Sequence, residues 1–400
     1  MDPVLLFSSD CHSGVIEQYK EYLDEEYLPD FEQWMGARPY VRIEKDSVQR
    51  ILSHAPLFFY PDKVIDEYED QLDERQAWAA ARGAERLEIL EAEGYVGEVL
   101  FPDAGVPFSR GFGGGAAMDA RALELQLAGQ RAYNRRLFDF VEPSRQVGTV
   151  MISYADIDVA VSTVHAGADA GMRGVLLDGP DPSYPVLGET FLHESYEPLW
   201  SAIEETGLVA HFHVGAGAPI GLYARPEVPH EVAQIEVPMF GHRALWWLIW
   251  GGVLERHPGL KFVFTEQGTS WVAPALKFMD WQWDGLSANR YTRRDMTLPM
   301  RPSDYWKRQC FSGASLMSIE DLNARDVLDP STIMYGTDYA HPEGTWMRTL
   351  PYLRAAFNAA GCTEAEVRMI CGENAVRCYG FDMDVLAPVA ERVGPSIDAL

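Results

Sequence analysis

The chain is poor in basic residues: 33 Lys and Arg side chains stand against 60 Asp and Glu, for a formal net charge of −27. A surface that binds nucleic acid needs a positive footprint, so this balance argues against nucleic-acid binding. The same deficit argues against docking on anionic membranes, which attract clusters of Lys and Arg. We therefore expect a small-molecule substrate, with neither nucleic acid nor a membrane among the partners.

Cysteine is also scarce, because the chain has five in total and no C-x-x-C pair. An odd number without paired spacing predicts no disulfide framework and suits a reducing compartment. The N-terminus lacks the basic and apolar regions of a secretory signal, and no stretch is long and apolar enough to span a bilayer. The most apolar segment, Ala244 to Leu254, is short and is interpreted as a core helix. We expect a cytoplasmic protein.

What the sequence does contain is a substantial apolar fraction, 47% of 400 residues, which suffices for one large barrel or two ordinary domains. Short apolar runs alternate with segments of helical composition, and near-continuous apolar character is typical of parallel strands buried on both faces. The eight candidate strands are 4–10, 95–102, 147–153, 172–179, 208–215, 260–268, 309–313 and 332–339.

Helices are expected between these runs, for example over 67–94, 119–143 and 192–207. Eight strand–helix alternations predict a distorted (β/α)8 TIM barrel that forms a single domain over 1–400. An open doubly wound sheet is the alternative, but no G-x-G-x-x-G follows a strand to support a dinucleotide site. The Gly-rich stretch 111–118 is interpreted as a flexible loop, or as a lid over an active site.

Two segments are too long for simple loops. The segment 14–68 is rich in aromatic and acidic residues, and 217–236 is rich in proline. Both follow strands, so both should lie on the C-terminal rim of the barrel, where such enzymes hold their active sites. We expect 14–68 to be an insertion that serves the rim or an oligomer interface.

Ionisable side chains stand at the ends of several predicted strands. Asp10 and His12 are two apart in the first strand and therefore share a face. His211 and His213 do so in the fifth strand, either as a hydrogen-bonded core pair or as a metal ligand with a neighbour. Glu266 follows the sixth strand, where a bare carboxylate is costly unless it is paired, protonated or near a cation.

Asp338 stands at the end of the eighth strand, with His341 just beyond it. If the barrel prediction is right, the ends of strands one, five, six and eight meet at its open mouth. Carboxylates and imidazoles gathered there predict a site for a divalent metal ion.

The same residues lie in segments that occur in a characteristic order along the chain: "SDCHSG", "YNRRLFDFV", "YEPLWSAIEETGLVAHFH", "LERHPGLKFVFTEQGTSWV", "YGTDYAHPEGTW" and "CGENAVRCYGFD". In these the chain resembles the amidohydrolase superfamily over nearly its whole length. More narrowly, it is similar to the group that contains aminocarboxymuconate semialdehyde decarboxylase, the resorcylate and carboxyvanillate decarboxylases, and some meta-cleavage-product hydrolases.

The resemblance implies one metal ion held by Asp10, His12, His213 and Asp338, with Asp338 also moving a proton. Two positions depart from the family pattern. The first ligand is commonly His or Glu and is Asp here. The sixth strand commonly ends in a His that acts on a water, and here Glu266 stands in its place. We expect Glu266 to hold a water or act as an acid, in preference to binding the ion.

We expect a metal-dependent hydrolase with Glu266, Asp338 and His341 as catalytic residues. Zn²⁺ is the favoured ion and Mn²⁺ the alternative. Substrate binding is assigned to His211, Trp271 and Trp346, in a pocket whose rim loops hold further aromatic residues: Phe31, Trp34, Phe58, Phe59, Phe108 and Phe112.

Two other functions stay open. A decarboxylase of aromatic or muconate-type acids would use the same ion, but it needs a partner for the leaving carboxylate, and only Arg110 and Arg243 stand in suitable loops. The departure at Glu266 also leaves room for a barrel that binds a small molecule without turnover. A homodimer is expected from the family resemblance and from the apolar segment 243–262.

Overall fold

The computed structural model describes residues 3–37, 83–102, 106–108, 119–179, 191–218, 227–286, 298–341, 344–346 and 348–400. Eight parallel strands pair in sequential order, and each coincides with one of the predicted apolar runs. They are β1 (Leu6–Ser13), β2 (Tyr95–Pro102), β3 (Gln146–Met151), β4 (Gly174–Leu177), β5 (Val209–His213), β6 (Phe262–Thr265), β7 (Cys310–Ser315) and β8 (Ile333–Gly336).

The sheet closes where β8 returns to β1. The backbone N–H of Asp338 donates to the carbonyl of Asp10 at 2.9 Å, and the N–H of His12 donates to the carbonyl of Tyr339. Cys11 and Tyr339 form the corresponding bridge. The predicted barrel is therefore confirmed, and the open doubly wound sheet is excluded, because the first and last strands meet. The residues that join them are the ones that carry the predicted ligands.

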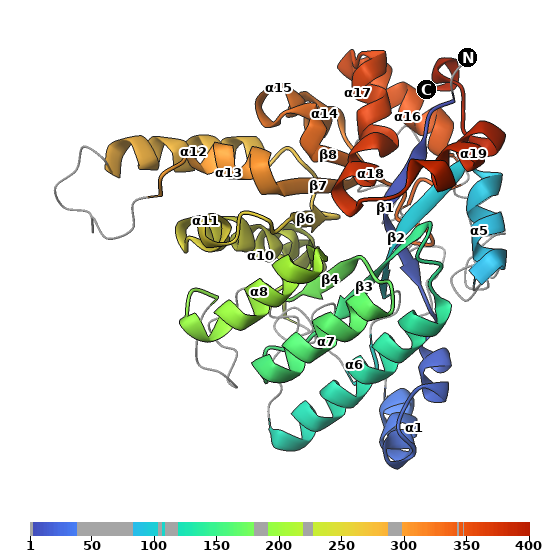
Figure 1. Cartoon of the computed structure of the whole chain (residues 1–400), viewed down its shortest axis with the longest axis vertical. Coiled ribbons are helices and arrows are strands. Elements are labelled where there is room, and N and C mark those ends of the chain that lie inside the picture. Colours follow the sequence, from blue (N-terminus) through green and yellow to red (C-terminus); the bar gives the residue numbers. More distant parts are fainter. Residues whose placement is uncertain are drawn as a thin grey trace.

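Helices surround the strands on the outside (Figure 1). Those between strands are α1 (Leu28–Ala37), α5 (Gly83–Ala92), α6 (Ala120–Phe140), α7 (Ile157–Asp169), α8 (Glu197–Thr206), α10 (His230–Trp250), α11 (Val253–Arg256), α12 (Val272–Leu286), α13 (Pro302–Gln309), α14 (Ile319–Asn323) and α15 (Arg325–Leu328). Those after β8 are α16 (Thr349–Ala360), α17 (Glu364–Arg368), α18 (Asn374–Tyr379) and α19 (Met383–Val393). None of the helices in the described part of the chain is long and apolar enough to cross a membrane.

Local sequence signals set the helix ends. The Asp119 carboxylate accepts a hydrogen bond from the N–H of Ala122 and so caps α6. Gly207 ends α8 in the left-handed conformation, which a residue without Cβ adopts at low cost. The helices expected over 119–143 and 192–207 are thus present. The helix expected over 67–94 is described from Gly83 onward, and its first part lies outside the described residues.

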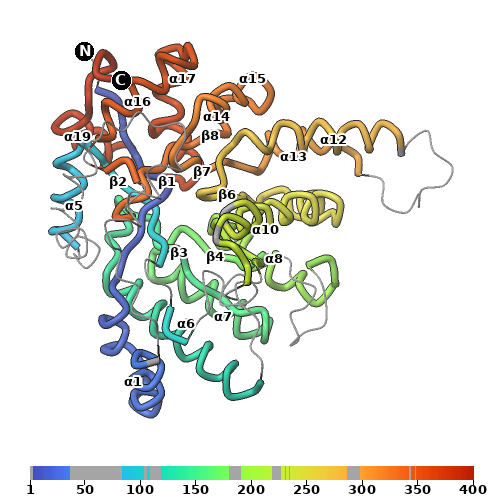
Figure 2. Tube along the Cα trace, turned by 180° about the vertical axis from the view of Figure 1, so that it is seen from behind, coloured from blue at the N-terminus to red at the C-terminus, as the bar shows by residue number. Residues whose placement is uncertain are grey.

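The C-terminal helices pack beside the first strand, so the two ends of the chain lie close together (Figure 2). The N–H of Val4 donates to the carbonyl of Pro395 at 2.8 Å. The buried amide of Asn374 donates to the carbonyls of Ile333 and Pro330 and so ties α18 to the start of β8. The segment "CGENAVRCYGFD" therefore packs at the end of the barrel where the strands begin, opposite the predicted metal site.

The described part of the insertion, residues 14–37, packs against α6. Its short helices η1 (Ile16–Glu21) and η2 (Glu25–Tyr27) lead into α1. Leu23, Tyr27 and Phe31 form a small apolar cluster with the alanines at 128 and 132 of α6. The rest of the predicted insertion, 38–68, lies outside the described residues. Elsewhere, α12 and α13 extend away from the barrel body (Figure 2).

Candidate metal centre

The first strand supplies two side chains to the open end of the barrel. Asp10 and His12 are both fully buried, and His12 Nε2 lies 3.6 Å from Asp10 Oδ1. His12 Nδ1 is 3.0 Å from the carbonyl of Pro102. A hydrogen bond from Nδ1–H to that carbonyl leaves the lone pair of Nε2 directed at the cluster, as in metal-binding histidines. The alternation of side chains along a strand explains why the sequence predicted this pair.

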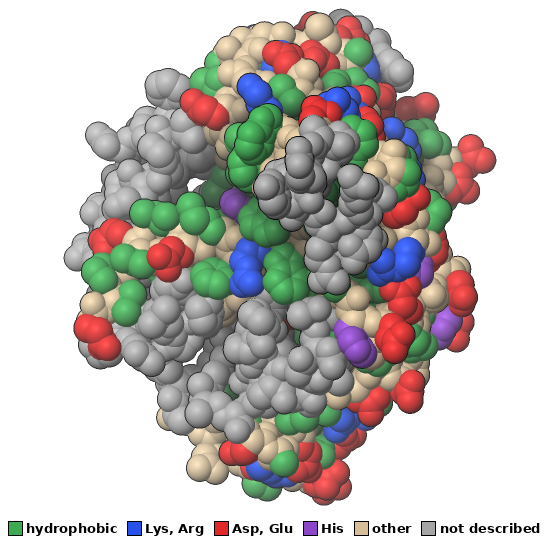
Figure 3. Space-filling model, turned by 90° about the vertical axis from the view of Figure 1, so that its left-hand side faces the viewer, with side chains coloured by type: hydrophobic (Ala, Val, Ile, Leu, Met, Phe, Trp, Pro, Cys, Tyr) green, Lys and Arg blue, Asp and Glu red, His purple; other side chains and the backbone are tan. Residues whose placement is uncertain are grey.

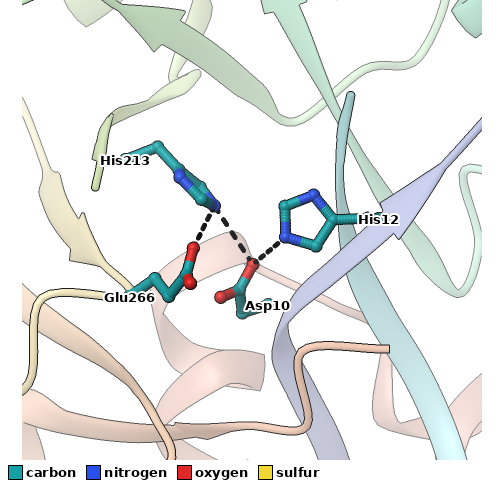
Figure 4. Close-up of side chains that lie close together, drawn as sticks. All are labelled: Asp10, His12, His213 and Glu266. Carbon is teal, nitrogen blue, oxygen red and sulfur yellow. Dashed lines mark ion pairs between the residues drawn. The ribbon is translucent and has the colours of Figure 1, made fainter. Parts of the chain in front are cut away.

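The fifth and sixth strands add an imidazole and a carboxylate. His213 Nε2 lies 3.4 Å from Asp10 Oδ1 and 3.4 Å from Glu266 Oε2. Figure 4 shows His12 and His213 directed at Asp10, and the Glu266 carboxylate directed at His213. One donor atom from each of Asp10, His12, His213 and Glu266 lies within 4.8 Å of all the others. Donors of one ion lie at most about 4.4 Å apart, so a small contraction would suffice.

The segment after the eighth strand completes the cluster from the other side. Asp338 Oδ1 lies 3.0 Å from His12 Nε2 and 3.1 Å from His341 Nδ1. The His341 ring stacks on the His12 ring, with a centroid distance of 3.7 Å and an interplanar angle of 16°. Asp338 is fully buried, while the His341 side chain is 19% exposed. His341 therefore connects the buried carboxylate with the solvent side of the cluster.

These donors suit a divalent cation on the grounds of their own chemistry. Oδ1 of Asp10 and both carboxylate oxygens of Asp338 are buried and accept no hydrogen bond from the described residues. Asp10 Oδ2 accepts one from the Ser315 hydroxyl. Among the ion pairs of the described chain, no Lys or Arg faces either carboxylate. Buried carboxylates without a cation are costly, and a metal ion among the imidazoles would supply the missing charge.

Burial and the contacts within the cluster shift the pKa values of its side chains. Burial would raise the pKa of Asp338, but the neighbouring His341 and His12 reverse the effect and lower that pKa below its usual value. Burial lowers the pKa of His213, against the opposing effect of Asp10. An ionised Asp338 and a neutral His213 are the protonation states that metal binding requires of these two residues.

Two of these carboxylates stand on unusual backbone. Glu266 and Asp338 both have φ of 56°, in the left-handed region that residues with a Cβ rarely adopt. Each comes directly after or close to the end of its strand, β6 or β8, so the turn re-aims the carboxylate. Such conformations cost of the order of 1–3 kcal/mol and occur most often at functional sites. The sequence contains little signal for them, because aspartate adopts this region only occasionally and glutamate rarely.

The three residues assigned to substrate binding lie in different surroundings. His211 is fully buried two residues before His213, with its ring parallel to that of Tyr379 and Nδ1 3.3 Å from the Thr265 hydroxyl. Burial, followed by the charge of His213, lowers the pKa of His211 to about 3. Neither group of potential metal donors in the described chain includes it. It lies deeper in the barrel than the cluster.

Trp271 and Trp346 lie after β6 and β8, on the side of the open end. Trp271 stacks on His242 at 3.8 Å and meets Phe264 edge-on. Trp346 is 5% exposed and packs against Tyr339 at 4.4 Å, next to Asp338. Figure 3 shows a face on which hydrophobic side chains gather around a Lys or Arg and a histidine.

The other predicted pocket residues divide into two groups. Phe31, Trp34 and Phe108 pack on one another beside α6. Arg243 lies over the rings of Phe240 and Trp247 on its own helix. Four of the predicted residues lie outside the described part of the chain: Phe58, Phe59, Arg110 and Phe112.

Sequence reasoning missed two contributors. Ser315 ends β7 and donates to Asp10, but a serine at a strand end is too common to be informative. His242 was not among the predicted site residues, and it stacks on Trp271. No local motif marks it, since it lies in the middle of α10 and reaches the open end only through the fold.

Comparison with known proteins agrees with this architecture. Among solved structures, an amidohydrolase from Mycobacterium avium subsp. paratuberculosis K-10 is 18% identical with a TM-score of 0.68, over 94% of this chain and 99% of that one. The 5-carboxyvanillate decarboxylase LigW2 from Novosphingobium aromaticivorans DSM 12444, solved with manganese and 3-methoxy-4-hydroxy-5-nitrobenzoic acid, is 16% identical with a TM-score of 0.63, over 94% and 97%.

A dihydroxybenzoic acid decarboxylase from Polaromonas sp. JS666, solved with manganese and 2-nitroresorcinol, is 16% identical with a TM-score of 0.55, over 95% and 97%. At these identities the likeness supports the barrel fold. No functionally curated protein matches the sequence significantly. The amidohydrolase family profile matches residues 54–381, which is most of the chain. The barrel and the match together show that the protein belongs to the amidohydrolase family, the group that the sequence motifs had indicated.

Proposed function

We propose that the protein is a metal-dependent carboxy-lyase that removes a carboxylate from a small aromatic acid. The observation that carries the metal-dependent part is the convergence of Asp10, His12, His213, Glu266 and Asp338 at the open end of the barrel. Decarboxylation, which the sequence alone ranked second, is favoured over hydrolysis because similar barrels with bound manganese include decarboxylases of hydroxylated benzoic acids.

We further propose that all five of these side chains hold one divalent ion. This departs from the expectation that Glu266 acts beside the ion, because its carboxylate belongs to the same group of donors as Asp10, His12 and His213. Three carboxylates and two imidazoles form an oxygen-rich set of five ligands. Such a set suits Mn²⁺ better than Zn²⁺, which usually takes four ligands in a tetrahedral arrangement. When bound, the ion would supply the positive charge that attracts the carboxylate and an adjacent hydroxyl oxygen of the substrate.

The chain's own contribution to the reaction is a proton. Loss of CO₂ breaks the bond between the ring and the carboxyl carbon and leaves the electron pair on the ring carbon. His341, oriented by Asp338 at 3.1 Å, donates its proton to that carbon and forms the new C–H bond. Because its side chain is partly exposed, His341 can recover a proton from solvent. Trp346 and Trp271 flank this end of the barrel and suit a flat ring.

Hydrolysis is the second candidate, and the position of Glu266 favours it. Its side chain is 17% exposed and lies at the cluster, where a carboxylate could take a proton from an attacking water. A small-molecule-binding barrel without turnover is the third reading, and the same experiment separates all three.

The test is a panel of hydroxybenzoates, aryl esters, amides and ring-cleavage products, each incubated in D₂O with protein loaded with Mn²⁺ or Zn²⁺. Decarboxylation should release CO₂ and place deuterium on the ring carbon that carried the carboxylate, as seen by NMR. Turnover of esters, amides or ring-cleavage products without CO₂ release would favour hydrolysis and reject the main proposal. Binding without turnover of any compound would favour the third reading.

A further inference from the structure

Next to the metal centre, on the side of β5 and β6, lies a second group of side chains whose polar atoms the reaction scheme does not use. It starts with Gln267, the residue after Glu266. The Gln267 side chain is 7% exposed and its Nε2 donates to the carbonyl of Phe212 at 2.7 Å. Phe212 precedes His213, so this amide is fixed between the two strand ends that carry metal-centre residues. Its Oε1 accepts no hydrogen bond from the described residues.

Helix α10 brings an imidazole to the same place. A Cβ on Gly241 would come within 2.8 Å of the Gln267 amide atoms, so the helix backbone touches this amide. His242 follows directly, and its ring stacks almost parallel on that of Trp271, with centroids 3.8 Å apart and planes at 12°. The three side chains therefore form one contiguous group, here called the β6 subsite: Gln267, His242 and Trp271.

The protonation of His242 follows from its surroundings. Burial lowers its pKa to about 4, and a hydrogen bond to the backbone of Gln267 opposes this only in part. The ring is therefore neutral near pH 7. Its Nε2 has no hydrogen-bond partner among the described residues, and in a neutral ring this nitrogen accepts in one tautomer and donates in the other.

The β6 subsite thus presents one buried acceptor, Gln267 Oε1, one buried donor, Trp271 Nε1, and the imidazole nitrogen His242 Nε2, none of which has a partner within the described chain. Buried polar atoms are nearly always paired, and leaving one unpaired costs about 1–3 kcal/mol. Three in one contiguous group, beside a metal centre, indicate a ligand that pairs with them. Since none of the three is charged at neutral pH, that ligand is a neutral group that both donates and accepts.

We propose that the β6 subsite binds a hydroxyl substituent of an aromatic acid and so selects hydroxylated substrates. The hydroxyl would donate to His242 Nε2 or Gln267 Oε1 and accept from Trp271 Nε1–H. A site built to pair with a substrate hydroxyl discriminates against the analogue that lacks it, because its own polar groups then stay unpaired. This inference rests on the proposed substrate class, and it adds the residues that decide specificity within that class.

The test compares benzoate with 2-, 3- and 4-hydroxybenzoate as ligands of the full-length, Mn²⁺-loaded protein, by isothermal titration calorimetry. The decisive variants are His242→Phe, which keeps a ring on Trp271 but removes the ring nitrogens, and Trp271→Phe, which keeps a ring but removes the donor. The matched controls are His165→Phe and Trp281→Phe, both at exposed positions on α7 and α12. Circular dichroism melting verifies that each variant is folded.

At least one of 3- and 4-hydroxybenzoate should bind the unaltered protein about 3- to 10-fold more tightly than benzoate, the effect of one net hydrogen bond. For 3- and 4-hydroxybenzoate, whose hydroxyl is not adjacent to the carboxylate, His242→Phe should reduce that ratio to about one and Trp271→Phe should reduce it in part, while both controls keep the ratio of the unaltered protein. The inference would be overturned if both variants kept the preference for the hydroxybenzoate over benzoate. It would also be overturned if the unaltered protein preferred benzoate, or bound none of the four acids.

Failure of the proposed function is distinguishable from failure of this inference. Hydroxyl discrimination that depends on His242, in a protein that releases no CO₂, would reject decarboxylation and keep the β6 subsite. If the protein releases CO₂ and neither variant changes its preference for hydroxybenzoates over benzoate, decarboxylation is kept and the β6 subsite is rejected.

Discussion

At the scale of single residues, the five-ligand metal site depends on Glu266, whose carboxylate lies 3.4 Å from His213 Nε2. If it binds the ion, Glu266→Gln should lower the metal content of the purified protein, because a neutral amide oxygen is a weaker ligand than a carboxylate. Added Mn²⁺ should then restore part of the rate. Metal content is measured by inductively coupled plasma mass spectrometry, with the exposed Glu88→Gln as the matched control.

A Glu266→Gln protein with full metal content would contradict this assignment. If its kcat were also lower, Glu266 would instead act on a water or the substrate, as the sequence had suggested. An unchanged kcat would show that the residue is structural.

A substitution at His341 distinguishes the effect of losing a proton donor from the effect of losing the metal. Its Nδ1 contacts Asp338 and its ring stacks on His12, and these three residues form a second group of possible metal donors. Because its side chain is 19% exposed, we assign His341 to proton transfer and not to the ion. His341→Asn should therefore keep the metal and lower kcat by about 10²–10⁴-fold, the usual effect of losing a general acid. Steady-state kinetics and metal analysis on the same sample measure both quantities. Loss of metal in this variant would instead make His341 a ligand.

At the scale of secondary-structure elements, the short apolar runs between helical segments were enough to predict all eight strands, because parallel strands buried on both faces leave a continuous apolar signature. The pairing of Asp10 with His12 followed from the period of a strand. The turns that carry Glu266 and Asp338 could not be predicted, since left-handed backbone at such residues is imposed by tertiary contacts. The same holds for His242, which depends on the packing of α10 against the end of β6.

One ionic contact joins elements that are distant in the sequence. Glu91 of α5 receives hydrogen bonds from Arg145 before β3 and from Arg392 of α19. The bond from Arg392, with a further one from Arg145, outweighs burial and lowers the pKa of Glu91 to about 2. A carboxylate with a depressed pKa in the folded state stabilises the fold above its unfolded pKa, and this contribution is lost as the pH falls through the folded value.

Glu91→Gln should therefore lower the free energy of unfolding by about 1–3 kcal/mol at pH 7, allowing for the partly exposed Arg392. The difference from the unaltered protein should shrink between about pH 4.5 and about pH 2, where Glu91 takes up its proton. Urea denaturation at a series of pH values measures it, with Glu88→Gln on the same helix as control. A difference that grew toward low pH would refute the assignment.

At the scale of the whole molecule, the predicted homodimer stays a prediction. Much of the apolar segment 243–262 is used within the chain, since Leu245, Leu248 and Ile249 are fully buried. Large apolar side chains instead remain exposed on α12, where Phe278 and Trp281 are 58% and 69% exposed and stack on each other. Exposed aromatic clusters of this kind are common at subunit interfaces.

We expect multi-angle light scattering to give the mass of a dimer at micromolar concentration. Changing both Phe278 and Trp281 to Ser should shift the protein toward the monomer without lowering its melting temperature. The exposed pair Val159 and Val327, changed to Ser, is the control. A monomer before any substitution would reject the dimer.

The central claim is that one divalent ion at the mouth of the barrel carries a decarboxylation. The most direct measurement is CO₂ release from a panel of hydroxybenzoates by chelated protein, as Mn²⁺ is added in increments. The rate should be near zero without metal, rise with added Mn²⁺, and level off at about one equivalent per chain, as expected of a mononuclear site. CO₂ release by chelated protein at the full rate, or no release from any acid at saturating Mn²⁺, would contradict it.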